Sequence, residues 1–280
     1  MLSSCKYAFN SAAWAPTVAD WTLVGQCIQS SECRRISEFY FKDDAKLCLS
    51  ARLLLRYALC KCLGVKWYDL KLSRTEKGKP ILDPVVHNVH KIYFNASHQG
   101  DYAAVVAHNE HNVGIDIMDV REKHGDNDTF FKLMDRQFTL HEWKSIRKPT
   151  NADDQMKTFY RHWCLKESYV KALGAGITYD LQSLSFSVSS PLSKTLVNDT
   201  RLYVKENLQP NWVFEESMLD ENHCVTVARD DETANHERLA SFKILSFGEI
   251  MSIAEPMCKT NEVDMKFIES YNKPFKSKRY

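Results

Sequence analysis

The sequence predicts an α+β fold built as a pseudo-twofold duplication, in which each half is a long helix packed on a small antiparallel sheet. The main observation is an internal match at a shift of 110 residues. The segment from Asp43, DDAKLCLSARLLLRYALCKCLGV, aligns with the segment from Asp153, DDQMKTFYRHWCLKESYVKALGA. Both read as helices that end in Leu-Gly, a common helix C-terminus.

The segments that follow these two helices also correspond. DLKL from Asp69 and DLQSLSF from Asp180 look like the next strands. YFNASHQGDYAAVVAHN then resembles VFEESMLDENHCVTVARD, which sets Phe94 against Phe214, and each ends in an apolar strand. The match needs small gaps, so chance similarity stays open as an alternative.

These matches divide the chain. We expect an N-terminal half over residues 1–113, a C-terminal half over 114–252, and a partly ordered extension over 253–280 with a solvated basic end. Two copies of one plan create a cleft between them, and clefts between domains are preferred ligand sites.

Composition limits the classes of function. The chain has 280 residues, 44% hydrophobic and 26% charged, with a net charge of +1, which argues against wholesale binding to nucleic acid or a membrane surface. Its nine cysteines include no Cys-x-x-Cys pair and suit a reducing compartment. The richest apolar run is cut by basic residues, so we expect no membrane span and a cytoplasmic location.

The stretch VGIDIMDV predicts a strand in which Asp116 shares a face with Gly114 and Met118. A carboxylate among such neighbours is costly unless it is paired, hydrogen-bonded or bound to a metal. The alternative is an Asp that caps a turn or lies on an exposed edge.

The helix WCLKESYVKALGAG carries Lys166, Glu167 and Lys171. Glu167 and Lys171 are spaced for a surface ion pair, which would be worth only about 0.3–0.5 kcal/mol. Glu167 together with Asp116 could instead hold Mg²⁺, which proteins usually bind with one or two carboxylates. The two lysines would then offset phosphate charge.

The first half supplies candidate phosphate ligands. In SRTEKGKP, three basic residues surround a glycine, namely Arg74, Lys77 and Lys79 around Gly78. NASHQG places Asn95, Ser97 and His98 in a loop at the end of an apolar strand. The alternatives are an exposed basic turn and a hydrogen-bonded turn, and Arg35 alone reads as an exposed helical arginine.

Together these motifs resemble a known family. VGIDIMDV followed by WCLKESYVKALGAG, with RTEKGKP and NASHQGDYA upstream, is similar to the 4'-phosphopantetheinyl transferases of the surfactin-synthetase-activating type, over about residues 13–252. The resemblance implies a pseudo-twofold monomer that binds coenzyme A in the cleft between its halves.

The resemblance also implies roles for individual residues. Asp116 and Glu167 correspond to the magnesium ligands and Lys171 to the lysine at the phosphates. Some members have a third acidic ligand where this chain has Met118, which puts a three-carboxylate site in doubt. The implied coenzyme A contacts are Arg35, Arg74, Lys77, Gly78, Lys79, Asn95, Ser97 and His98.

The implied reaction transfers 4'-phosphopantetheine from coenzyme A to a serine of an apo acyl- or peptidyl-carrier domain and releases adenosine 3',5'-bisphosphate. Glu167 is the first candidate for the base that takes the serine proton, and a water on the metal is the second. Fatty-acid synthase and aminoadipate reductase are the implied carrier partners. The alternatives are a non-catalytic module that binds coenzyme A or a carrier domain, and a magnesium-dependent nucleotide pyrophosphate hydrolase.

Overall fold

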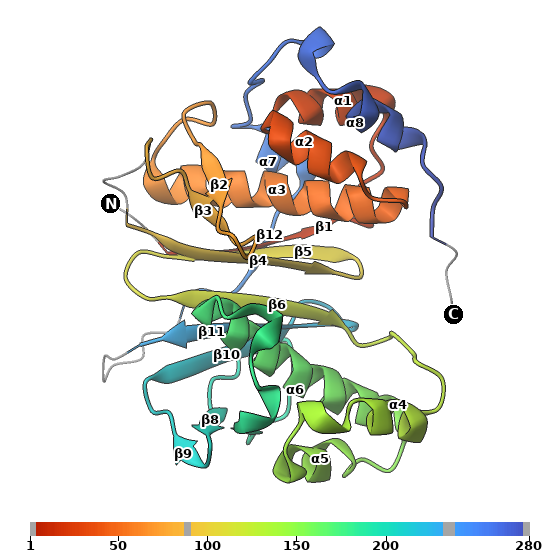
Figure 1. Ribbon diagram of the computed structural model, residues 1–280, viewed down its shortest axis with the longest axis vertical. Helices are drawn as coiled ribbons and strands as arrows, with labels where there is room; N and C mark the ends of the chain where they lie inside the picture. The colour runs from red at the N-terminus through yellow and green to blue at the C-terminus, as the bar shows by residue number, and fades with distance from the viewer. Residues whose placement is uncertain (1–3, 87–90, 232–238, 277–280) are drawn as a thin grey trace. The chain divides into compact units, whose positions relative to one another are not determined.

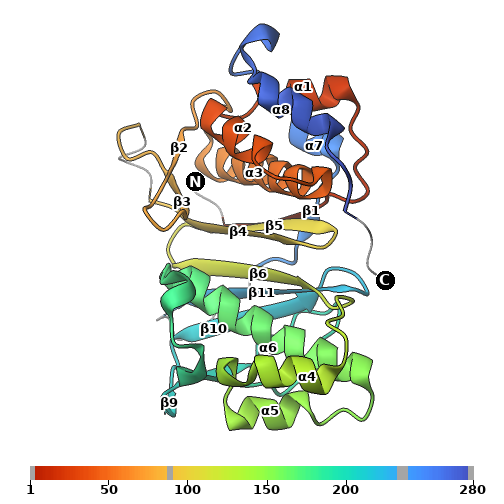
Figure 2. The ribbon, with the colours of Figure 1, turned by 45° about the vertical axis from the view of Figure 1, so that its right-hand side comes forward.

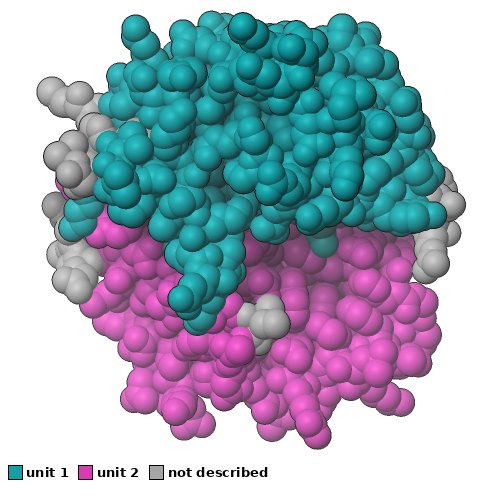
Figure 3. Space-filling view, turned by 45° about the horizontal axis from the view of Figure 1, so that its top comes forward, with its two compact units in different colours: residues 1–92, 96–109, 242–280 teal, residues 93–95, 110–241 magenta. Residues whose placement is uncertain are grey.

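The structure is a computed structural model that describes residues 4–86, 91–231 and 239–276 (Figure 1). Contacts divide the chain into two compact units, coloured separately in Figure 3. Unit 1 comprises residues 1–92, 96–109 and 242–280, and unit 2 comprises residues 93–95 and 110–241. Each unit is described by itself.

Unit 1 is built around a sheet with the strand order β12-β1-β5-β4. Strand β1 pairs antiparallel with β5, but β12 pairs parallel with β1, so the sheet is not wholly antiparallel as expected. The added edge strand comes from the chain after residue 241, which sequence comparison of the two halves could not reveal. The strands are β1 (Cys5–Asn10), β4 (Tyr93–Gln99), β5 (Tyr102–His108) and β12 (Lys243–Ile244).

One long helix, α3 (Lys42–Leu63), covers a face of this sheet, and α1, α2 and α8 lie on the other side of α3 (Figures 1 and 2). Fifteen of its 22 residues are buried, because it is covered on both sides. The other elements of unit 1 are α1 (Val18–Gln26), α2 (Ser30–Ser37), β2 (Leu72–Arg74), β3 (Pro80–Leu82), α7 (Phe247–Met251), η4 (Thr260–Glu262), α8 (Met265–Glu269) and η5 (Ser270–Asn272).

Unit 2 repeats this plan with an antiparallel sheet of order β10-β11-β6 and a long helix, α6 (Ala152–Leu173), packed on it. Helices α4 and α5 lie on the side of α6 away from the sheet (Figure 2). The other elements are β6 (Val113–Asp119), α4 (Asn127–Leu133), η1 (Asp135–Gln137), α5 (Leu140–Ile146), η2 (Gly176–Thr178), η3 (Leu181–Ser183), β7 (Leu184–Ser187), β8 (Arg201–Val204), β9 (Asn207–Leu208), β10 (Trp212–Met218) and β11 (His223–Asp230).

The predicted α+β fold of two similar halves is confirmed. Helices α3 and α6 are each 22 residues long and begin and end 110 residues apart. Both stop at a glycine in the left-handed region, Gly64 at φ 67° and Gly174 at φ 65°. The strand order β1-β5-β4 of unit 1 also matches β6-β11-β10 of unit 2.

The C-terminal segment differs from the expected partly ordered extension. Its helix α8 packs on α1 and α2, where the Phe267 ring stacks on Trp21 with centroids 5.6 Å apart. The Trp21 indole Nε1 also donates a hydrogen bond to the Phe267 carbonyl oxygen at 3.0 Å. The segment therefore folds as part of unit 1, so the compact units divide the chain differently from the predicted ranges 1–113, 114–252 and 253–280. Part of the expected basic end, residues 277–280, lies outside the described residues.

None of the helices in the described ranges combines the length and apolar character needed to cross a membrane. All nine cysteines are free thiols, and seven of them are buried. Sulfur in this chain therefore serves mainly as core packing.

Candidate functional site

In unit 2, strand β6 and helix α6 approach each other very closely at Gly114. A methyl group added to Gly114 would lie 2.1 Å from the backbone oxygen of Ser168 and 2.3 Å from the backbone nitrogen of Ala172. Only glycine fits there without moving the helix away from the strand. Since side chains on a strand alternate, Asp116 faces the same helix two residues further along.

Asp116 is an acidic residue buried against α6. Its side chain is 6% exposed, and its Oδ1 lies 2.5 Å from the Nζ of Lys171, whose side chain is 31% exposed. The amide of Asn95 donates from Nδ2 to the Lys171 carbonyl oxygen at 3.4 Å. The prediction that Asp116 is paired and not an exposed edge residue is therefore correct.

Glu167 lies close enough to Asp116 for the two carboxylates to influence each other. Burial raises the pKa of Glu167, the neighbouring Asp116 charge raises it further, and Lys171 lowers it. Glu167 and Lys171 are thus part of one cluster with Asp116, which a plain surface ion pair would not explain. We call Asp116, Glu167 and Lys171 the carboxylate–lysine cluster.

Met118 faces the same helix, in the apolar core. It is 8% exposed and packs in a cluster with Phe131, Cys164 and Cys224. Across the described ranges, no three His, Cys, Asp or Glu side chains gather where they could share a metal ion.

Lys166 has a structural role, so the expectation that it offsets phosphate charge is wrong. Its side chain is fully buried, and its Nζ lies 2.9 Å from the Glu142 carboxylate and donates to the carbonyl oxygens of Leu181 and Leu184 at 2.7 Å. Glu142 also accepts from the backbone of Thr139 and Phe186. This buried ion pair ties α6 to α5 and to the start of β7.

The predicted basic residues lie in unit 1. Arg74 ends β2, and the turn to β3 contains exposed Lys77 followed by Gly78 at φ 82° and Lys79. Arg74 donates from Nη1 to the Gly78 carbonyl oxygen at 2.7 Å. The structure therefore confirms a basic turn.

Arg74 and Arg35, an exposed residue of α2, share a pocket of about 320 Å³ with Arg52 of α3. Sequence analysis missed Arg52, which looked like one of the charges interrupting an apolar run.

Asn95, Ser97 and His98 lie within strand β4 and not in a loop after it, as had been expected. The strand continues to Gln99 and only then turns at Gly100, which has φ 58°. The polar letters concealed the strand because Asn95 and Ser97 are buried while their neighbours alternate in exposure. Asn95 belongs to unit 2 and Ser97 and His98 to unit 1.

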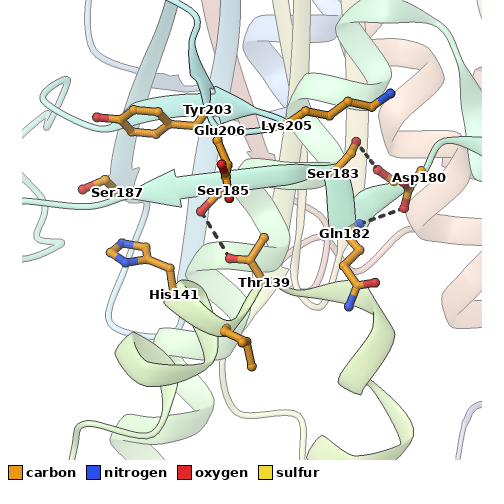
Figure 4. Close-up of a pocket in the computed structure, with 11 residues that line it drawn as sticks. Thr139, His141, Asp180, Gln182, Ser183, Ser185, Ser187, Tyr203, Lys205 and Glu206 are labelled. Atoms are coloured by element: carbon orange, nitrogen blue, oxygen red, sulfur yellow. Dashed lines mark hydrogen bonds between the residues drawn. The ribbon is translucent and has the colours of Figure 1, made fainter.

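A separate pocket of about 820 Å³ in unit 2 is shown in Figure 4. Thr139 and Ser185 share a hydrogen bond of 3.2 Å across it, and Ser183 and Gln182 donate to Asp180. No residue of the carboxylate–lysine cluster lines it, so it is distinct from the candidate active site.

Sequence comparison places the chain in a family. The model of the 4'-phosphopantetheinyl transferase superfamily matches residues 112–228, and the model described as "4'-phosphopantetheinyl transferase, N-terminal" matches residues 12–110. The chain belongs to the 4'-phosphopantetheinyl transferase family, and it is a transferase that moves phosphopantetheine to carrier domains.

Individual relatives are similar over most of their length. The human L-aminoadipate-semialdehyde dehydrogenase-phosphopantetheinyl transferase is 39% identical over 272 residues, covering 91% of this chain and 88% of the relative. The Xenopus laevis protein of the same name is 35% identical over 292 residues, covering 100% and 96%. A phosphopantetheinyl transferase of Thraustochytrium sp. is 32% identical over 238 residues, covering 82% and 79%.

Proposed function

We propose that this transferase takes the 4'-phosphopantetheine arm from coenzyme A, attaches it to a serine hydroxyl of an apo acyl- or peptidyl-carrier domain, and releases adenosine 3',5'-bisphosphate. The observation that carries the chemistry is the carboxylate–lysine cluster. It combines two acidic groups of mutually raised proton affinity with a cation, on the rigid pair β6 and α6. The serine oxygen forms a bond to the phosphorus that carries the pantetheine, the pyrophosphate bridge breaks, and the serine proton passes to a base.

The cluster fits Mg²⁺ by the chemistry of its donors. Magnesium prefers hard oxygen ligands and is commonly held by one or two carboxylates together with substrate phosphates and water. Asp116 and Glu167 would hold it, and the repulsion that raises the pKa of Glu167 would be relieved by a cation. When bound, the ion supplies neutralisation of phosphate charge. The Met118 thioether is a soft donor packed in the core, so we do not include it among the ligands.

Glu167 and Lys171 have separate roles in the proposal. A carboxylate of raised pKa is a stronger base near neutral pH than an ordinary glutamate, so Glu167 is the candidate for the serine proton. Lys171 is partly exposed, and its flexible stem allows the ammonium to turn from Asp116 toward a phosphate oxygen. Asn95 holds the backbone carbonyl of Lys171 and thereby positions that part of α6.

The basic residues of unit 1 are the proposed coenzyme A contacts, namely Arg35, Arg74, Lys77 and Lys79 with the backbone of Gly78. Ser97 and His98 of β4 complete this set. The placement of coenzyme A between the two halves stays a prediction.

We further propose the partners and setting of the enzyme. The names of the vertebrate relatives include L-aminoadipate-semialdehyde dehydrogenase, which supports an aminoadipate reductase carrier domain as one substrate, and the family resemblance adds fatty-acid synthase carriers. The free thiols support a cytoplasmic location. Two similar halves in one chain support a monomer, which light scattering would test.

One assay tests the reaction. The protein is incubated with coenzyme A, Mg²⁺ and an apo carrier domain, and the carrier is weighed by intact-protein mass spectrometry. A phosphopantetheine adduct on the carrier supports the proposal. Loss of coenzyme A without an adduct would show hydrolysis, and unchanged coenzyme A and carrier would show a binding module, so either result overturns it.

A further inference from the structure

Arg52 is a buried arginine whose charge the protein leaves uncompensated. It is 8% exposed, and among the residues that the structure describes its Nε and Nη1 have no hydrogen-bond partner. Arg56, one turn further along α3, donates to the carbonyl oxygens of Trp67 and Leu70 and to the Gln29 side chain. Arg56 thus holds the fold together, whereas Arg52 awaits a partner.

The unsatisfied guanidinium lines the unit 1 pocket together with two further arginines. The pocket of about 320 Å³ is also lined by Arg35 and Arg74 and by the hydroxyl-bearing residues Ser31 and Ser73. Burial lowers the pKa of Arg74, and the positive charges of Arg52 and Arg35 lower it further. Three guanidinium groups therefore repel one another around one small space.

Such an arrangement costs free energy unless an anion enters. A buried charge without a partner is unfavourable, and three converging cations increase the penalty. Glu32 also lines the pocket, but its carboxylate accepts from the backbone nitrogen of Gln29 as part of the α2 capping box. Guanidinium groups bind phosphate oxygens in pairs, and hydroxyls donate to the remaining oxygens. The pocket is therefore suited to a phosphate group.

We propose that Arg52, with Arg35 and Arg74, binds the 3'-phosphate monoester of coenzyme A and makes the enzyme select coenzyme A over dephospho-coenzyme A. This inference rests on the proposed function, which assigns the reacting pyrophosphate to the carboxylate–lysine cluster. The 3'-phosphate is the one monoester in coenzyme A, and a monoester carries about two negative charges near pH 7. It matches a three-arginine pocket better than a pyrophosphate oxygen, which carries less charge per phosphorus.

Binding of small ligands tests the inference without carrier or transfer. Calorimetry compares adenosine 3',5'-bisphosphate with adenosine 5'-monophosphate, for the wild type and for Arg52→Met. The wild type should prefer the bisphosphate, and Arg52→Met should bind it roughly ten- to a hundredfold more weakly while binding the monophosphate as before. Arg34→Met removes an exposed arginine beside Arg35 and should leave both affinities unchanged.

Thermal unfolding separates ligand binding from a structural role. Without ligand, Arg52→Met should unfold at the same or a higher temperature than the wild type, because it removes an uncompensated buried charge. Arg56→Met, which loses its carbonyl contacts, should unfold at a lower temperature. If Arg52→Met is destabilised as much as Arg56→Met, Arg52 is structural and the inference fails.

The remaining outcomes are also decisive. If Arg52→Met keeps the wild-type preference for the bisphosphate, the monoester lies elsewhere, even where the wild type transfers phosphopantetheine normally. Inorganic phosphate that competes as well as the bisphosphate would identify free phosphate as the occupant and overturn the assignment. Failure of the proposed function would appear separately, as a carrier without an adduct.

Discussion

Replacing Gly114 with alanine tests whether the contact between β6 and α6 positions the carboxylate–lysine cluster. The new methyl group would lie 2.1 Å and 2.3 Å from two backbone atoms of α6, which cannot rotate away. Relief requires strand and helix to separate by about 1 Å. Overpacking of this kind costs about 1–3 kcal/mol, and we expect the upper part of that range because both contacts are with backbone.

The same separation should misplace Asp116, two residues along, relative to Glu167 and Lys171. A displacement of about 1 Å can lower turnover about a hundredfold. Urea denaturation measures the loss of stability, and carrier mass spectrometry measures the transfer rate of the variant that stays folded. Gly248→Ala is the control, because nothing lies within 4 Å of an added methyl group at that position of α7.

The reasoning would be refuted by a Gly114→Ala enzyme whose free energy of unfolding stays within about 0.5 kcal/mol of the wild type and whose transfer rate is normal. Such a result would mean that α6 shifts freely and that the glycine is not required for the cluster.

Three further predictions concern neighbouring residues. Lys166→Met leaves the Glu142 carboxylate buried without its cation, and urea denaturation should show a loss of about 3–5 kcal/mol; a neutral result would mean that the ion pair is dispensable. Met118→Ala should lose about 2–5 kcal/mol of stability yet keep most of its magnesium-dependent turnover, and turnover as low as that of Asp116→Ala would instead make Met118 part of the site. Because the pKa of Glu167 is raised on folding, the native state holds its proton to higher pH, and stability should fall as pH rises from the ordinary glutamate range through the raised pKa; Glu167→Gln should lack this part of the slope in urea titrations at several pH values, and an identical slope would contradict the assignment.

The duplicated plan could be predicted from sequence because it depends on local signals that survive divergence. The helix-ending glycines, Gly64 and Gly174, are needed for a left-handed backbone whatever packs around them. The apolar spacing of α3 and α6 depends in the same way on one buried face. These features align at a shift of 110 residues although few other letters agree.

The carboxylate–lysine cluster could be predicted only in part. The alternation in β6 predicted that Asp116 lies with Gly114 and Met118, but only the resemblance brought Asp116 and Glu167 together. Sequence could not separate Lys166 from Lys171, because adjacent letters on a helix point about 100° apart and the partner of Lys166, Glu142, is 24 residues away.

Arg52 and the C-terminal segment were missed for a related reason. A charge within an apolar run usually marks a solvent-facing position, and nothing local shows that Arg52 reaches a pocket shared with Arg35 and Arg74. The polar C-terminal segment conceals a few large apolar side chains, among them Phe267, whose contacts with Trp21 join residues 246 positions apart. Both features depend on long-range packing.

The account depends most on the claim that Asp116 and Glu167 form the magnesium-dependent catalytic site. The direct measurement is the initial rate of phosphopantetheine adduct formation on an apo carrier across a magnesium titration, for the wild type and for Asp116→Asn and Glu167→Gln, each checked for normal thermal unfolding. We predict that the wild-type rate requires Mg²⁺ and that each variant is slower by roughly two orders of magnitude or more at saturating Mg²⁺. A wild-type rate unaffected by removal of Mg²⁺, or either folded variant at nearly the wild-type rate, would contradict the account.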